Sequence, residues 1–136
     1  DLQQALELVS YGDTIWVAQG IYRPTLTPDR SISFVIPNGV SILGGFNGSE
    51  IEAIQRNWEV SPTTLSGDIG VQGDSLDNSY HVIRIFGADS TTLIDGFVIT
   101  HGYAFKENDF GEANHGAGAY IGVNVNMAVS TPKFIN

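Results

Sequence analysis

The sequence of 136 residues contains no cysteine. This excludes disulfide frameworks, thiolate zinc sites and cysteine nucleophiles. Basic residues are scarce, because six Lys and Arg stand against fifteen Asp and Glu, and the formal net charge is −9. Such a charge disfavours nucleic acid as a partner, since cations that neutralise phosphates supply most of that affinity. No apolar run reaches the roughly 18 residues needed to span a bilayer, so we expect no membrane insertion in this segment.

Glycine is abundant, with sixteen residues. Glycine-rich composition with few cations suits strands and tight turns more than helices. The length predicts a single domain over residues 1–136. The chain starts at Asp1 inside a helical pattern and stops at Asn136 inside a strand pattern, so we expect a fragment of a longer protein.

A short amphipathic helix is predicted within residues 1–12. One apolar stripe at helical spacing is formed by Leu2, Ala5, Leu6 and Val9. Gly12 can take a positive φ just beyond the last turn. We expect this helix to cap the strands that follow, whose core and edge would otherwise be open.

A strand pattern recurs along the rest of the chain. Residues 40–46 (VSILGGF) return fifty-one residues later as residues 91–97 (TTLIDGF), with shorter copies at 13–17 and 63–68. The apolar anchors of these copies, spaced 23 to 28 residues apart, are Ile15, Ile42, Leu65 and Leu93. A short strand that recurs every twenty-odd residues is typical of a solenoid.

This spacing predicts an all-β fold, a parallel β-helix in which each strand pairs with its copy one coil away. Residues 1–12 form the capping helix and residues 13–136 form the coils. Two excursions leave the coils, at residues 47–62 and 101–115. In the first excursion, an apolar helical face is predicted from the spacing of Ile51, Ile54 and Trp58.

Seven motifs, in chain order, carry a family resemblance. They are residues 12–22 (GDTIWVAQGIY), 34–46 (FVIPNGVSILGGF), 55–58 (QRNW), 64–69 (TLSGDI), 77–82 (DNSYHV), 93–100 (LIDGFVIT) and 116–120 (GAGAY). With them the chain resembles pectin-lyase-like right-handed parallel β-helix repeat proteins, above all the large exported, adhesin-like proteins of Bacteroidetes-like bacteria, which are similar to polymorphic outer-membrane proteins. The resemblance implies a right-handed β-helix in an extracellular or bacterial cell-surface location. His101 departs from the family pattern, which more often has Gly after the Thr.

An acidic stretch suggests a metal site. Asp68, Asp74 and Asp77 lie within ten residues and are interspersed with glycines. Calcium favours several carboxylate and carbonyl oxygens on a flexible loop, so calcium is a candidate cofactor here. The alternative is that these carboxylates cap turns in a solvated loop.

Catalysis on an acidic polysaccharide would need a different set of residues. A lyase needs a base and a cation beside the substrate carboxylate, and the candidates are Arg84, Lys106, Lys133 and His101. No two of them share a repeat position. A hydrolase needs paired carboxylates, and Asp68 with Asp95 is the candidate pair, although a one-residue offset turns them to opposite faces of a strand.

The remaining histidines and tryptophans have mainly structural interpretations. His81 is expected to be a hydrogen-bonded structural residue, whereas His101 and His115 flank the second excursion and could meet at its base as a weak metal site. Trp16 is expected in the core, and Trp58 is expected to pin the first excursion to the side of the coils.

Aromatic residues in the second excursion are the best ligand-contact candidates. They are Tyr103, Phe105 and Phe110, because apolar side chains on an acidic loop need a reason to be there.

We therefore expect a non-catalytic extracellular scaffold that presents loops for adhesion or carbohydrate binding. Its partners would be a cell-surface or extracellular glycan or protein and further β-helix coils of the same chain. The alternative is the N-terminal part of a polysaccharide lyase or glycoside hydrolase that acts on acidic polysaccharide.

Overall fold

A computed structural model describes residues 1–107, 111–122 and 131–135, and in them the fold is mostly β, with parallel sheets and a single short α-helix. Sheet A contains β1 (Thr14–Ala18), β4 (Ser41–Phe46), β7 (Leu93–Asp95) and β10 (Lys133–Ile135). Sheet B contains β2 (Gly20–Tyr22), β5 (Thr63–Ser66) and β8 (Phe97–Thr100). Sheet C contains β3 (Phe34–Ile36), β6 (Ile83–Phe86) and β9 (Ala119–Gly122).

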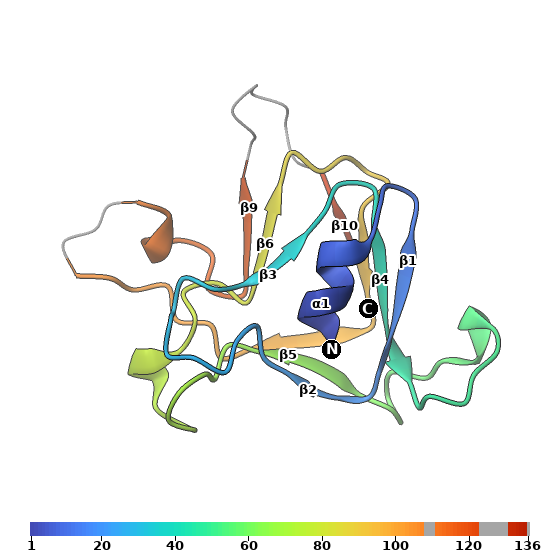
Figure 1. Cartoon of the computed structure of the whole chain (residues 1–136), viewed down its shortest axis with the longest axis horizontal. Helices are drawn as coiled ribbons and strands as arrows, with labels where there is room; N and C mark the ends of the chain where they lie inside the picture. The colour runs from blue at the N-terminus through green and yellow to red at the C-terminus, as the bar shows by residue number, and fades with distance from the viewer. Residues whose placement is uncertain (108–110, 123–130, 136) are drawn as a thin grey trace.

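The chain visits these sheets in a constant order. It passes through sheets A, B and C three times, in round 1 (β1 to β3), round 2 (β4 to β6) and round 3 (β7 to β9), and returns to sheet A with β10. All neighbouring strands are parallel, so each strand lies beside its counterpart in the next round. The three sheets face a common interior (Figure 1).

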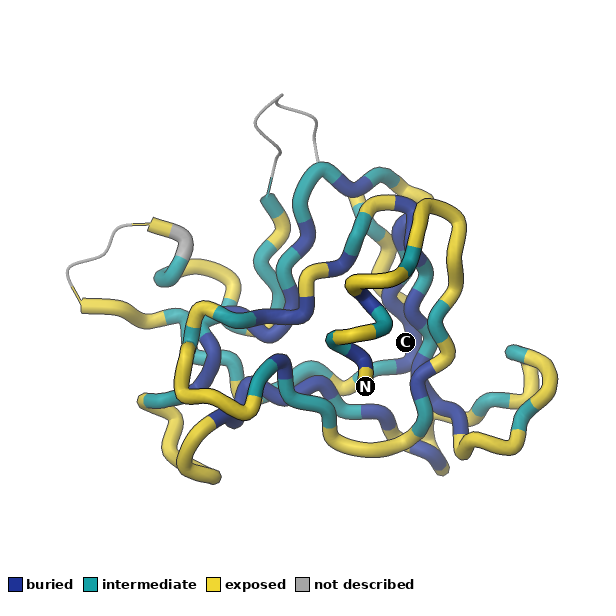
Figure 2. The backbone as a smooth tube through the Cα atoms, in the orientation of Figure 1, coloured by how far each residue is buried: buried dark blue, intermediate teal, exposed yellow. Residues whose placement is uncertain are grey.

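The core is formed by inward residues that meet their counterparts in register. In sheet A, Ile42 pairs with Ile15 on one side and Ile94 on the other. In sheet C, Ile36 pairs with Ile85. Ile42 and Ile85 are fully buried, and buried residues recur along strands of all three sheets (Figure 2). The apolar side chains of successive rounds thus bury one another.

The observed register corrects the predicted repeat. Ile42 pairs with Ile94 and not with Leu93, so the offset between the two copies is 52 residues and not 51. Leu65 belongs to sheet B, where it pairs with Tyr22 and Ile99. The four predicted anchors therefore do not share one sheet position. Strands in all three sheets have a similar apolar pattern, and connections of unequal length separate them, so pattern alone does not assign a strand to its sheet.

The N-terminal helix α1 (Leu2–Leu8) lies across the round 1 edge of the sheets (Figure 1). The Asp1 side chain accepts hydrogen bonds from the first N–H groups of the helix, which is a standard N-cap. Leu2 and Leu6 are buried in the core, as the predicted stripe requires. Gly12 follows with a φ of 92°. No described helix has the length and apolar character needed to cross a membrane.

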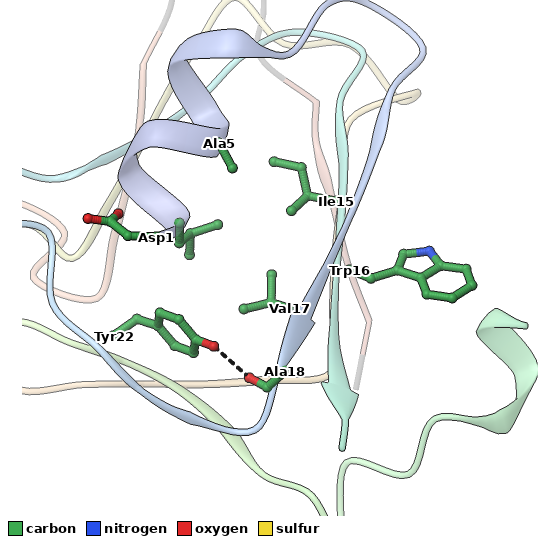
Figure 3. Close-up of a pocket in the computed structure, with 8 residues that line it drawn as sticks. Asp1, Ala5, Ile15, Trp16, Val17, Ala18 and Tyr22 are labelled. Carbon is green, nitrogen blue, oxygen red and sulfur yellow. Dashed lines mark hydrogen bonds between the residues drawn. The ribbon is translucent and has the colours of Figure 1, made fainter. Parts of the chain in front are cut away.

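A cavity of about 290 Å³ lies between α1 and the first two strands. Ala5 faces Ile15 across it, and the Tyr22 hydroxyl donates a hydrogen bond to the Ala18 carbonyl at 3.0 Å (Figure 3). Trp16 points away from the interior in the same view. Its side chain is 43% exposed and stacks on Phe46 with 4.7 Å between ring centres, so the prediction of a core position for Trp16 is wrong.

Residues 47–62 connect β4 to β5 outside the sheets (Figure 1). They contain the 3-10 helix η1 (Ala53–Gln55) and no α-helix. Ile51 and Ile54 are exposed, so the predicted apolar helical face is wrong. The segment contacts the sheets through other side chains.

Arg56 attaches this connection to the sheets. Its Nη1 donates to the Gly44 carbonyl at 3.2 Å, and its Nη2 donates to Asp95 Oδ2 at 2.5 Å. The guanidinium carbon also lies 5.4 Å from the centre of the Trp58 ring. One cation therefore joins the connection to two adjacent strands of sheet A, and Trp58 packs on that cation.

Gly44 lies where the backbones of β4 and the β7–β8 corner approach most closely. A Cβ at this position would clash with the Gly96 carbonyl oxygen. We expect Gly44→Ala to lower the free energy of unfolding by about 1–3 kcal/mol, because inserting an atom into a tightly packed site forces the backbone to shift.

Urea denaturation checks this prediction, with Gly118→Ala as the matched control. A Cβ at Gly118 would make only an ordinary contact with Ile99 at 3.7 Å, so the control should stay within about 0.5 kcal/mol of the unsubstituted protein. Equal losses in the two variants would contradict the close approach at Gly44.

Candidate functional site

The three connections from sheet B to sheet C lie together on one side of the molecule (Figure 1). We call them loop 1 (residues 23–33), loop 2 (67–82) and loop 3 (101–118), and their joint surface the loop face. Each loop follows a strand of sheet B. Because β2, β5 and β8 pair in parallel, the three loops begin at adjacent strand ends. The loop face is therefore a direct product of strand pairing.

Arg30 of loop 1 binds both other loops. Its Nε donates to the Asn78 carbonyl at 2.7 Å, and its Nη2 donates to the Tyr103 carbonyl at 2.8 Å. Its guanidinium carbon lies 4.2 Å from the centre of the Tyr80 ring and 5.5 Å from that of Tyr103. Charged hydrogen bonds and cation–π contacts of this kind fix position as well as adding stability. Sequence reasoning missed Arg30.

Loop 1 also carries a short hydrogen-bonded turn just before β3. The hydroxyl and the backbone N–H of Ser31 both donate to Asp29 Oδ1, at 2.7 and 3.0 Å. These bonds, the hydroxyl first, lower the pKa of Asp29 below its usual value. The turn is therefore stabilised above the pKa of Asp29 in the unfolded chain, and this stabilisation is lost as the pH falls through the folded pKa.

Two of the three predicted ligand-contact residues lie together on loop 3. The rings of Tyr103 and Phe105 have centres 6.0 Å apart and an interplanar angle of 42°. Phe105 is 53% exposed, whereas Tyr103 is half-buried against Arg30. Phe110 lies outside the described residues. The ligand-contact role of these residues stays a prediction, but Phe105 has the exposure that it requires.

Each candidate calcium ligand accepts a backbone N–H group of its own loop. The pairs are Asp68 Oδ1 with Gly73 at 3.0 Å, Asp74 Oδ1 with Leu76 at 2.9 Å, and Asp77 Oδ2 with Val71 at 2.7 Å. Within the described ranges, no three or more His, Cys, Asp or Glu side chains are placed to hold a metal ion. The three carboxylates shape the turns of loop 2, which is the alternative to a calcium site that the sequence left open.

Arg23 is a second residue that sequence reasoning missed. It lies in loop 1, and its Nε donates to the backbone carbonyl of Asp68 at 2.6 Å. Its Nη2 is 3.9 Å from Asp68 Oδ2, and the Asp68 side chain is only 9% exposed. The two residues line a cavity of about 300 Å³ between loops 1 and 2. The one sequence signal for Arg23 is its position beside the prolines of loop 1. No local pattern predicts that Arg23 pairs with Asp68.

The candidate hydrolase pair does not form. Asp95 lies in sheet A and binds Arg56, whereas Asp68 lies in loop 2 beside Arg23. The two aspartates had similar positions in the predicted repeat only because that repeat assigned Leu65 and Leu93 to the same sheet. Among the lyase candidates, Arg84 is in β6 of sheet C, where its guanidinium carbon lies 4.9 Å from the Phe86 ring centre, and Lys133 is in β10 of sheet A. Lys106 and His101 are in loop 3.

The histidines have separate environments. His81 is buried, with Nδ1 3.2 Å from the Gly116 carbonyl oxygen, as the structural interpretation predicts. His115 Nδ1 is 3.0 Å from the Gly111 carbonyl oxygen. His101 has a φ of 58° and is the one described non-glycine residue with a positive φ. This conformation favours glycine, so His101 occupies a backbone position that few residues with a side chain adopt.

We expect Arg30→Lys to loosen the loop face although the charge is kept. Lysine lacks the planar fork that reaches two carbonyl groups and two rings at once. The free energy of unfolding should fall by about 1–2 kcal/mol, and hydrogen exchange at the Tyr103 amide, which bonds the Ser79 carbonyl at 2.9 Å, should accelerate.

Exchange at the Asn57 amide provides the internal control for this variant. That amide bonds the Gly45 carbonyl, far from Arg30 in the fold, and should keep its rate. Equal exchange rates at Tyr103 before and after the substitution would show that Arg30 does not fasten the loops.

We expect the melting temperature to be the same in calcium and in chelator, because the carboxylates of loop 2 are already bound to N–H groups and Arg23 opposes a second cation near Asp68. Thermal denaturation in each condition checks this. A rise with calcium that Asp77→Asn abolishes would instead establish loop 2 as a calcium site.

The chain was compared with known families, curated proteins and solved structures. No family model matches it, and no curated protein or solved structure does so either. The function is therefore inferred from the loop face, its exposed aromatic edge and its cavity.

Proposed function

We propose that the chain is a right-handed parallel β-helix segment that acts as a non-catalytic extracellular scaffold and presents its loop face for adhesion or carbohydrate binding. The observation that carries this proposal is that Arg30 holds three loops from successive rounds in one surface, with Phe105 exposed at its edge.

The strand order supports the β-helix. The chain returns to each sheet once per round, and all neighbouring strands are parallel. Connections between parallel strands of one sheet are right-handed in nearly all proteins, which supports the hand. In such an arrangement a connection can lengthen outward while the strands keep their register, so loops are the natural place for binding residues.

The loop face has properties that suit a contact surface. Phe105 offers an exposed ring, and the neighbouring Tyr103 is held by the Arg30 hydrogen bond to its carbonyl. A surface that is rigid before binding loses less conformational entropy when a partner docks. The net charge of −9 favours neutral partners over polyanions.

The far edge of the sheets supports the proposed pairing with further coils of the same chain. β8, β9 and β10 are the last strands of their sheets, at the edge opposite α1. An apolar cavity of about 180 Å³ at this edge is lined by residues that include Phe97, Ile99 and Phe134. Apolar side chains and strand edges of this kind are buried when another strand is added.

Binding to a panel of immobilised neutral and acidic polysaccharides tests the proposed function. We expect Phe105→Ala to weaken binding about tenfold or more, because truncating an aromatic anchor removes a large share of the contact energy. Val98→Ala is the matched control: Val98 is 52% exposed against 53% for Phe105, but lies in sheet B. Binding to no member of the panel, or equal binding by both variants, would contradict the proposal.

The same polysaccharides separate the scaffold from the lyase alternative. Incubation with alginate, chondroitin and pectate should produce no rise in ultraviolet absorbance from unsaturated products. A steady rise that Arg84→Ala or Lys106→Ala abolishes would replace the scaffold function with a lyase activity.

A further inference from the structure

The cavity between loops 1 and 2 contains an ion pair that is held slightly open. Arg23 is fixed by its Nε bond to the Asp68 backbone, yet its Nη2 stays 3.9 Å from Asp68 Oδ2. This distance exceeds the 2.7–3.2 Å of a direct hydrogen bond. A polar contact at such a separation leaves room for a bridging hydroxyl group. Both partners face the same cavity of about 300 Å³.

The walls of the cavity are fixed before any ligand arrives. Asp68 Oδ1 is bonded to the Gly73 amide, so Oδ2 is the oxygen left toward Arg23. The Asp77 carboxylate holds the neighbouring Val71 amide at 2.7 Å. Ile69 is fully buried and forms an apolar part of the lining. The carboxylates of loop 2 thus keep the open pair in position.

The charges of the pair select the class of ligand. An anionic group near Arg23 would be repelled by Asp68, and a cation near Asp68 would be repelled by Arg23. A neutral hydroxyl group fits both, since it accepts a hydrogen bond from the guanidinium and donates one to the carboxylate. Gln72 adds an amide, and Leu26, which is 94% exposed, adds an apolar side chain at the rim for the C–H face of a ring.

We propose that this cavity binds a neutral, hydroxyl-rich sugar residue, with one hydroxyl bridging Arg23 Nη2 and Asp68 Oδ2. The inference rests on the proposed glycan-binding function and names its ligand class, which is neutral hexoses and not uronic acids. A cavity of about 300 Å³ is at the small end of ligand sites, which suits a single sugar residue.

An adjoining cavity extends the site toward α1. It has a volume of about 330 Å³ and shares Arg23, Thr25 and Leu26 with the first cavity. Its lining also includes Tyr22 and Phe34. A second sugar residue of the same chain can therefore occupy the other side of Arg23, which favours a neutral oligosaccharide over a free monosaccharide.

Titrations followed by ligand-observed NMR test the proposal. The probes are methyl glycosides of glucose, galactose and mannose, the corresponding uronic acids, and the disaccharides of the neutral hexoses. We expect at least one neutral hexoside to bind, its disaccharide to bind more tightly, and the uronic acid of the same configuration to bind at least tenfold more weakly.

Two substitutions locate the binding at the open pair. Asp68→Asn keeps the shape and the Gly73 bond but removes the charge, so neutral hexosides should bind about tenfold more weakly and the preference against uronic acids should shrink. Leu26→Ala changes an exposed side chain that the fold does not need, and should weaken hexosides severalfold. Val71→Ala, an exposed residue of loop 2 outside the cavity lining, is the matched control and should leave binding unchanged.

The outcomes distinguish this inference from the proposed function. The loop-face function stands if Phe105→Ala abolishes polysaccharide binding. The cavity proposal is nevertheless wrong if no hexoside binds, or if Asp68→Asn and Leu26→Ala bind hexosides as tightly as the unsubstituted protein. Tighter binding of uronic acids than of neutral hexosides would also overturn the cavity proposal. Absence of any glycan binding would overturn both.

Discussion

Parallel pairing of each strand with its counterpart in the next round is the constraint on which the rest of the structure depends. Paired strands lie about 4.8 Å apart, so successive rounds follow nearly the same path. Extra residues then have no place inside a round and are displaced into the connections. This is why the backbones approach so closely at Gly44 and Gly96, and why residues 47–62 and the three loops contain most of the irregular structure in the described part of the chain.

Three of the six cations hold these connections in place. Arg56 joins residues 47–62 to sheet A, Arg23 joins loop 1 to loop 2, and Arg30 joins loop 1 to both other loops. In each case the guanidinium binds at least one backbone carbonyl group. For Arg23 and Arg30 that carbonyl belongs to an irregular loop, whose backbone groups have no partner in a sheet.

The two proposed contact elements use the same scaffold in different ways. Phe105 presents an exposed ring above loops held by Arg30, whereas Arg23 and Asp68 line a cavity between neighbouring loops. The acidic residues of loop 2 connect the structural and functional arguments, because the hydrogen bonds that shape its turns also hold Asp68 in place. A neutral glycan that spans the loop face would meet both elements.

Local patterns in the sequence determined the mostly-β class, the capping helix with buried Leu2 and Leu6, the strand at residues 40–46 and the structural role of His81. Each of these depends on periodicity or turn chemistry over a few neighbouring residues. Only the tertiary structure decided the 52-residue register, the sheet to which Leu65 belongs, and the partners of Arg23 and Arg30. The contacts of Arg23 and Arg30 alone join residues 45 to 73 positions apart. They depend on how many residues each connection takes up before the chain returns to its sheet, and no local pattern records that length.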